Sequence, residues 1–319
     1  MAVARQLSGM ADRGDFVLPL QLAALGVRGR AVRLGRVINA ILSRHDYPAP
    51  VAALLGETLV LGSALASSLK YDGIFTLQLR GDGPVRLVVV DLTSDGALRG
   101  YAQFDARAVE AALATVALDP VSRLPENPVP RLLGAGNMAF TVDQGPDTRR
   151  YQGVVALDGA TLADCAHHYF RQSEQLATGL KLAVGRIGNG WRGAALMLQA
   201  LPSAELIAGV DADERDDRWR KAVILLGSAT AAEMLDASLP VEALLLRLFH
   251  EDGVRAFDRR PLRDQCRCSR ERIDRVLRTI RRSELDELRD AGGRVVVTCE
   301  FCSTTYRYAD ADLDALETA

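Results

Sequence analysis

The cysteine spacing constrains this chain more than any other feature of its sequence. Four of its five cysteines form two tight pairs, a C-x-C at Cys266 and Cys268 and a C-x-x-C at Cys299 and Cys302. The first pair alone is compatible with chance, a disulfide, a metal site or a redox sensor. Together, the two pairs can present four thiolates to one tetrahedral metal ion, for which zinc is the usual occupant. We therefore predict these four residues as ligands of one zinc ion, rather than as buried cysteines without a ligand role.

The segments around the two pairs predict a small C-terminal module. Ser269 can cap a helix whose apolar residues follow helical spacing, and Ser283 with Asp286 resembles a second capping box. The stretch "RVVVTCEFCSTTYRY" predicts strand, turn and strand, with the C-x-x-C at the turn. A thioredoxin-like site would need its C-x-x-C at the start of a helix, so the β-prone "STTYRY" that follows argues against a thiol oxidoreductase.

The rest of the chain predicts an α+β fold, with an antiparallel sheet and a few helices in the N-terminal part. Alternating or continuous apolar runs predict strands, and "GDG" between two of them indicates a hairpin. Thr161 as N-cap with Asp164 three residues later predicts the start of a helix over 161–175. The predicted strands lie in residues 16–34, 74–104, 137–159, 176–185 and 191–202, and residues 119–135 predict a loop.

The segment 50–70 is apolar enough to raise the question of a membrane span. Glu57 towards its middle would be costly in a bilayer, and Gly56 and Gly62 are typical close-packing positions of a buried helix. The N-terminus shows no long apolar run of a signal peptide. We therefore predict a buried helix, no membrane partner and a cytoplasmic protein.

The character of the chain changes after Pro202. Residues 211–253 show helical periodicity, a dense mixed-charge opening and weak breaks at Gly227 and Pro240, which predicts two or three helices that pack on another part of the protein. We expect three parts: an α+β core over 1–207, a helical linker over 208–265 and the zinc module over 266–319.

The arginine-rich stretch "SRERIDRVLRTIRR" raises an alternative function, a zinc module that binds nucleic acid. Against this, the module contains ten arginines and eleven acidic residues, and no aromatic stacking platform lies nearby in the sequence. A solvated charged face and no nucleic-acid partner are therefore favoured.

Two weaker motifs suggest enzymes and are set aside. Cys165 with His167 and His168 could suggest a thiol nucleophile, but these spacings on a helix align nucleophile and base poorly. The "GAGNMA" stretch at 134–139 lacks the strand before it and the helix after it that a dinucleotide site needs. We predict that the protein is not an enzyme.

Several long motifs resemble the heat-shock protein 33 family of redox-regulated bacterial chaperones. They include "CRCSRERIDRVL", "VVVTCEFCSTTYRY", the segment that begins at "HDYPAPVAALLGETLVLG", "RYQGVVALDGATLADCAHHYFRQSEQ" and "EALLLRLFHEDGVRAFDRRPL". The resemblance runs from about residue 25 almost to the end of the chain. The first 24 residues match nothing in it, and we expect them to be partly disordered.

The resemblance implies a holdase, an ATP-independent chaperone that binds unfolding proteins and prevents their aggregation. The reduced form would hold one zinc ion on Cys266, Cys268, Cys299 and Cys302 and would be idle. Oxidation would form the disulfides Cys266–Cys268 and Cys299–Cys302 and release the metal, after which the linker would unfold and the protein would dimerise. A disulfide across C-x-C closes a small strained ring, so it should be easily reduced again.

The linker also suggests where clients bind. Its apolar residues include 223–225 and 244–246, which could form the client surface or cover it. This assignment is a hypothesis that the resemblance does not settle.

Overall fold

The computed structural model describes residues 14–145, 148, 150–171, 175–201 and 211–318. The chain forms two compact units, residues 1–264 and residues 265–319. Each unit has its own hydrophobic core, and each is described here by itself. The division of the first unit into a core and a linker over residues 208–265 stays a prediction.

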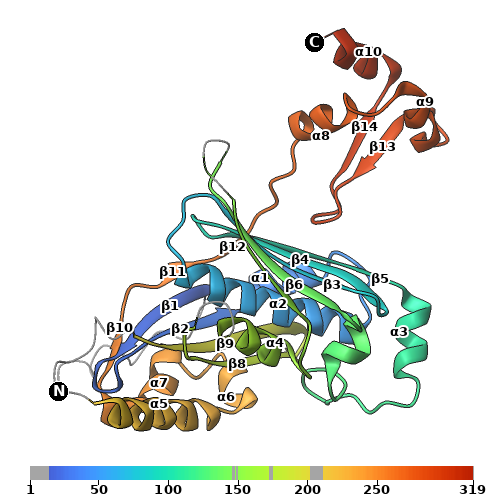
Figure 1. The fold of residues 1–319 in the computed structure, drawn as a ribbon. Helices are drawn as coiled ribbons and strands as arrows, with labels where there is room; N and C mark the ends of the chain where they lie inside the picture. The colour runs from blue at the N-terminus through green and yellow to red at the C-terminus, as the bar shows by residue number, and fades with distance from the viewer. Residues whose placement is uncertain (1–13, 146–147, 149, 172–174, 202–210, 319) are drawn as a thin grey trace. The chain divides into compact units, whose positions relative to one another are not determined.

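The first unit contains two six-stranded sheets (Figure 1). Neighbouring strands are antiparallel, except that β12 pairs with β5 in parallel. The first sheet has the order β10-β1-β2-β9-β8, with β11 also pairing with β1; its strands are β1 (Phe16–Leu22), β2 (Val27–Leu34), β8 (Thr178–Ile187), β9 (Gly190–Ala200), β10 (Val254–Ala256) and β11 (Arg260–Pro261). The second has the order β12-β5-β4-β3-β6-β7, with β3 (Ile74–Gly81), β4 (Val85–Thr93), β5 (Ala97–Phe104), β6 (Gly136–Asp143), β7 (Tyr151–Ala156) and β12 (Arg263–Asp264). The predicted α+β class and antiparallel strands are confirmed.

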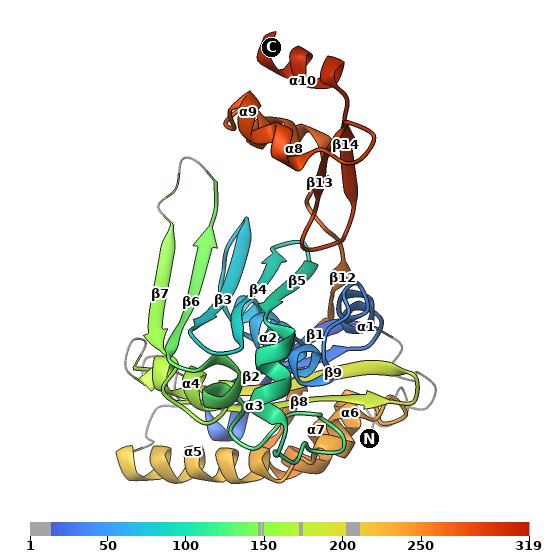
Figure 2. The same cartoon turned by 90° about the vertical axis from the view of Figure 1, so that its right-hand side faces the viewer.

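Helix α2 (Ala49–Ser68) lies between the two sheets and contacts both (Figure 2). Its small residues permit this close packing: a Cβ atom on Gly56 would lie 2.9 Å from Val184 Cγ1 of β8, and one on Gly62 would lie 3.2 Å from Val90 Cγ1 of β4. Among the described residues, α2 is the one helix long and apolar enough to cross a membrane. Because 89% of its apolar window is buried inside the protein, it is the predicted core helix.

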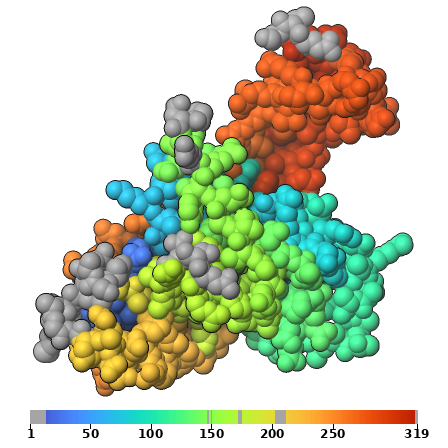
Figure 3. Space-filling view, in the orientation of Figure 1, coloured from blue at the N-terminus to red at the C-terminus, as the bar shows by residue number. Residues whose placement is uncertain are grey.

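Helices α5 (Ala212–Gly227), α6 (Ala231–Leu235) and α7 (Val241–Phe249) cover the other face of the first sheet (Figures 2 and 3). Strand β1 shows how this sheet is buried on both sides. Phe16, Leu18 and Leu20 pack in a second core with residues of these helices, whereas Val17 packs in the first core with α2. The predicted helices with breaks at Gly227 and Pro240 are confirmed.

An arginine on the first sheet holds the end of α6. Arg33 of β2 is 8% exposed, and its guanidinium donates hydrogen bonds to the backbone carbonyls of Glu233 (3.2 Å), Asp236 (2.6 Å) and Leu239 (3.3 Å). A cation at the C-terminal end of a helix satisfies carbonyls that have no partner within the helix. Arg33 therefore fixes the segment between α6 and α7 to the sheet.

The C-terminal part of the predicted helical linker is extended, which corrects the prediction. Residues 254–264 form β10, β11 and β12, which add to the edges of the two sheets. Backbone N–H groups of Phe257, Leu262 and Arg263 donate to carbonyls of Pro19, Asp15 and Gly96. The free edges of β1 and β5 thus offer hydrogen-bond partners that outweigh any local helical preference.

Other differences from the predictions lie at the ends of elements. The capping box of Thr161 and Asp164 is present, but α4 (Leu162–Tyr169) ends earlier than predicted, and residues 172–174 lie outside the described residues. The predicted loop over 119–135 contains a short π-helical segment (Val129–Leu133). Phe16–Leu22 is β1, in agreement with the strand predicted within 16–34, and residues 1–13, where the rest of the expected disorder would fall, lie outside the described residues. The first unit also contains the helices α1 (Arg36–Leu42) and α3 (Ala106–Leu113), and its 3-10 segments are Ala23–Leu25 and His250–Asp252.

The second unit is a β-hairpin with short helices. Its elements are α8 (Arg270–Leu277), α9 (Arg282–Leu285), a 3-10 segment (Asp286–Leu288), β13 (Val295–Thr298), β14 (Thr305–Tyr308) and α10 (Asp310–Thr318). Ser269 caps α8 as predicted, but Ser283 lies inside α9 rather than at its start. The buried core consists of Leu277, Leu285, Val295, Tyr308 and Leu313. A core this small rarely stabilises a domain without a metal or a disulfide.

Candidate metal centre

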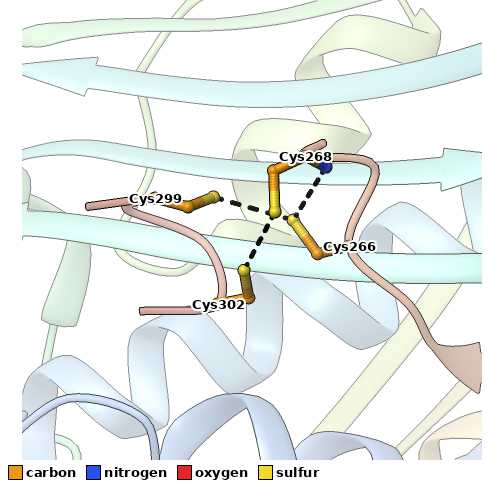
Figure 4. A group of neighbouring side chains, drawn as sticks. All are labelled: Cys266, Cys268, Cys299 and Cys302. Carbon is orange, nitrogen blue, oxygen red and sulfur yellow. Dashed lines mark hydrogen bonds between the residues drawn. The ribbon is translucent and has the colours of Figure 1, made fainter. Parts of the chain in front are cut away.

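The structure brings the four predicted cysteines together (Figure 4). The Sγ atoms of Cys266, Cys268, Cys299 and Cys302 all lie within 4.8 Å of one another. The distance is 3.7 Å between Cys266 and Cys299 and 3.2 Å between Cys268 and Cys302. Four sulfurs about 2.3 Å from one tetrahedral zinc ion would be about 3.8 Å apart. All four are free thiols, and their arrangement is suited to a metal ion.

The local backbone explains this convergence. Cys299 and Cys302 lie on the turn between β13 and β14, where the Cys299 N–H donates to Thr304 O and the Ser303 N–H donates to Cys299 O. Ser303 has a φ of 58°, a left-handed conformation that closes the turn. Cys266 and Cys268 lie in the segment before α8, where the Cys268 N–H points to Cys266 Sγ at 3.5 Å. The hairpin and this segment thus present their sulfurs to the same point.

The electrostatics of the cluster favour a cation. Burial and the neighbouring thiols raise the pKa of Cys268, and burial also raises the pKa of Cys299. Burial acts in the same direction on Cys302, but hydrogen bonds from Thr304 and from neighbouring thiols outweigh it and lower the pKa of Cys302 to about 6. One thiolate therefore forms easily and opposes ionisation of the others. A divalent cation would remove this conflict by stabilising all four thiolates, so the residues present fit such an ion.

Two residues of β14 and its turn support the sulfurs and were not predicted. The Tyr306 hydroxyl donates to Cys268 Sγ at 3.2 Å, and the Thr304 hydroxyl lies 3.2 Å from Cys302 Sγ. Such outer hydrogen bonds orient metal ligands. The signal was available, because residues 304, 306 and 308 share one face of an extended strand that starts beside Cys302.

The arginines near the centre are partly neutralised within the module. Arg270 pairs with Asp312 at 3.1 Å and its guanidinium lies 4.3 Å from the Tyr308 ring, while Arg282 pairs with Asp310 at 2.9 Å. These pairings support the solvated charged face over a phosphate-binding surface. The absence of a nucleic-acid partner stays a prediction.

Cys165 lies far from the metal centre in sequence and is buried in the first core. Burial, with the nearby carboxylate of Asp164, raises the pKa of its thiol to about 11. A thiol in this environment is a poor nucleophile. The structure therefore supports a packing role for Cys165.

Comparisons with known proteins agree with this architecture. A family model described as Hsp33 protein matches residues 15–309. A 33 kDa chaperonin of Caulobacter vibrioides is 44% identical over 298 residues, which span 92% of this chain and 94% of that protein. A 33 kDa chaperonin of Pseudomonas fluorescens is 37% identical over 91% of this chain and 89% of that protein. The crystal structure of the heat shock protein 33 homologue of Thermotoga maritima, 21% identical, has the same fold, with a TM-score of 0.77 over 95% of this chain and 98% of that one. The chain therefore belongs to the Hsp33 family of chaperones.

Proposed function

We propose that this protein is a redox-regulated holdase, idle when reduced and active when oxidised. The observation that carries the proposal is the cluster of four free thiols at metal-ligand distances in a unit with five buried core residues. Such a unit depends on its metal for folding, and the same thiolates are the groups that oxidants attack. One set of residues can thus hold the module together and sense the oxidant.

In the reduced protein, Cys266, Cys268, Cys299 and Cys302 would hold one zinc ion, which would neutralise the thiolates. Oxidation would form the disulfides Cys266–Cys268 and Cys299–Cys302. Each disulfide requires the loss of two electrons from a pair of zinc-bound thiolates. Hydrogen peroxide would accept these electrons, together with two protons from solvent, to give two molecules of water, and the zinc would leave as Zn²⁺. The disulfides would remove the metal ligands, and the hairpin would lose the tie to the segment before α8.

The client surface would arise where the helices α5–α7 cover the first sheet. Release of these helices would expose Phe16, Leu18 and Leu20, which are at most 3% exposed in the docked state. The linker residues that could form or cover the client surface, 223–225 and 244–246, divide into two groups. Leu244 and Leu245 are buried against the sheet, whereas Ile224 is 65% exposed before any release. This burial supports a client surface that is formed by the first sheet and by the helices α5–α7, and that is hidden while these helices are docked.

Sequence adjacency would connect the metal centre to this interface. Asp264 ends β12 two residues before Cys266, and residues 254–264 lead back along the sheet edges to α7. Strands of two or three residues hold few hydrogen bonds, so they should separate easily from the edges when the module unfolds. We further propose that the protein acts in the cytoplasm, dimerises when oxidised and has neither a membrane nor a nucleic-acid partner.

The test measures zinc release and client aggregation in the same samples. Peroxide with mild heat should release about one zinc per chain and produce a protein that suppresses light scattering by a denatured enzyme. The reduced sample should not suppress it. Cys165→Ser provides a matched control outside the centre and should behave as the wild type. If the oxidised, zinc-free protein leaves aggregation unchanged, the holdase proposal is wrong.

A further inference from the structure

A cavity in the first unit has no part in the proposed metal centre. It has a volume of about 680 Å³, within the size range of small-molecule sites. Its walls come from the C-terminal end of α2, from β1 and β2, from the β4–β5 turn and from residues 259–262. We call it the Arg30 cavity.

Three basic side chains line the Arg30 cavity without a carboxylate partner among the described residues: Arg30, Lys70 and Arg260. Two hydrogen bonds position the Arg30 side chain: its Nε donates to Ser67 O at 3.1 Å and its Nη1 donates to Gly29 O at 2.8 Å. These two bonds use neutral carbonyl acceptors and leave the positive charge unbalanced. Burial, and then the charges of Arg260 and Arg28, lower the pKa of Arg30 to about 10.

The other charged side chains that line the cavity do not neutralise the positive charge of Arg30, Lys70 and Arg260. Asp95 is the acidic side chain that lines the cavity, and it pairs with Arg263. Arg259 also lines the cavity, but Glu242 holds it through both carboxylate oxygens at 2.7 and 2.8 Å. Arg30 is partly buried, whereas Lys70 and Arg260 are exposed, so solvent weakens the repulsion among these cations. The cavity nevertheless has an excess of positive charge that an anion bound between them would neutralise.

We propose that the Arg30 cavity binds a small anion that carries phosphate groups. Guanidinium groups match the geometry of phosphate oxygens, and lysine contributes a point charge to the same ligand. Three unbalanced cations favour a polyvalent anion over a monocarboxylate. The volume admits a diphosphate or a nucleotide diphosphate.

The position of the cavity gives the bound anion a regulatory consequence, which rests on the proposed function. Arg260 belongs to β11, in the segment that would leave the sheet on activation, whereas Arg30 and Lys70 belong to the core. An anion bound to both sides would stabilise the docked state alone. At a free concentration ten times its dissociation constant, it would lower the equilibrium constant for release about tenfold.

The binding test uses the full-length, reduced, zinc-loaded protein and inorganic pyrophosphate as the probe. Isothermal titration in phosphate-free buffer should show saturable binding that weakens as salt is added. Arg260→Gln and Lys70→Gln should each weaken binding at least tenfold, whereas Arg107→Gln, an exposed residue of α3, should not change it. Inorganic phosphate and ADP in separate titrations distinguish a simple phosphate site from a nucleotide site.

Stability provides a readout that a purely structural role would not produce. Because Arg260→Gln relieves repulsion, its melting temperature without anion should equal or exceed that of the wild type, yet pyrophosphate should no longer raise it. Absence of saturable binding at millimolar pyrophosphate, or equal affinity in the wild type and both cavity variants, would overturn the site. This outcome is separate from failure of the holdase proposal, because client aggregation by the oxidised protein is measured without the anion.

Discussion

Replacing Leu245 with alanine should activate the reduced protein without any oxidation. Leu245 lies on α7, is 1% exposed and packs in the second core against the first sheet. Truncating a buried leucine to alanine costs about 3 kcal/mol through lost burial and the cavity that remains. If the loss falls on the docked state, the ratio of released to docked helices rises about 150-fold.

The neighbouring residue provides a matched control. Leu246 lies on the same helix and is 38% exposed, so Leu246→Ala makes the same chemical change outside the interface. Substitutions at such positions change stability by about 0.5 kcal/mol or less, which corresponds to about a twofold change in the ratio. Reduced Leu246→Ala should therefore remain idle.

The assay combines client aggregation with hydrogen exchange on the reduced, zinc-loaded variants. Leu245→Ala should suppress light scattering by a denaturing enzyme, and amides of α5–α7 should exchange faster while those of β3–β5 stay protected. The combination separates local release from general unfolding of the unit. Faster exchange in α5–α7 without any suppression of aggregation would refute the reasoning, because it would show that uncovering the sheet does not create the client surface.

Three further predictions concern the hydrogen bonds of Arg33 to the α6–α7 segment, the buried carboxyl group of Glu57 and the metal. Arg33→Gln removes donors to three backbone carbonyls and should weaken docking of α6 by about 2 kcal/mol, measured as faster proteolysis between α6 and α7. Burial raises the pKa of Glu57 from 4.5 to about 7, and its Oε2 has no hydrogen-bond partner in the described structure. The folded state therefore holds this proton more tightly than the unfolded chain, so the stability that Glu57 contributes is complete below about pH 4.5 and falls by about 3 kcal/mol as the pH rises through 7. Thermal unfolding of Glu57→Gln should lack this decline, and an equal decline in both proteins would exclude the assignment. A strong zinc chelator under reducing conditions should abolish amide protection in β13 and β14 but not in β3–β5; persistent protection would show that the module folds without metal.

The candidate metal centre could be predicted from the sequence because its information is local. Cys266 and Cys268 share one short segment, Cys299 and Cys302 share one turn, and residues of strand type flank the second pair. The long strands and α2 were also predictable, since runs of seven or more residues carry enough pattern to identify an element. The sequence shows that residues 304 and 306 share one face of an extended segment, but their roles were missed because only the fold shows that this face meets the sulfurs.

Other features depend on segments that are distant in the chain. Strand β1 reads "FVLPLQL", which is apolar at nearly every position, so its pattern does not reveal that one face packs on α2 and the other on α5–α7. Strands β10–β12 are two or three residues long and form because β1 and β5 offer unpaired backbone groups at their edges. The Arg30 cavity unites residues more than two hundred positions apart. The ligand set thus follows from local spacing along the chain, whereas the hidden sheet face and the basic cavity follow from packing, because burial and charge balance depend on which distant surfaces meet.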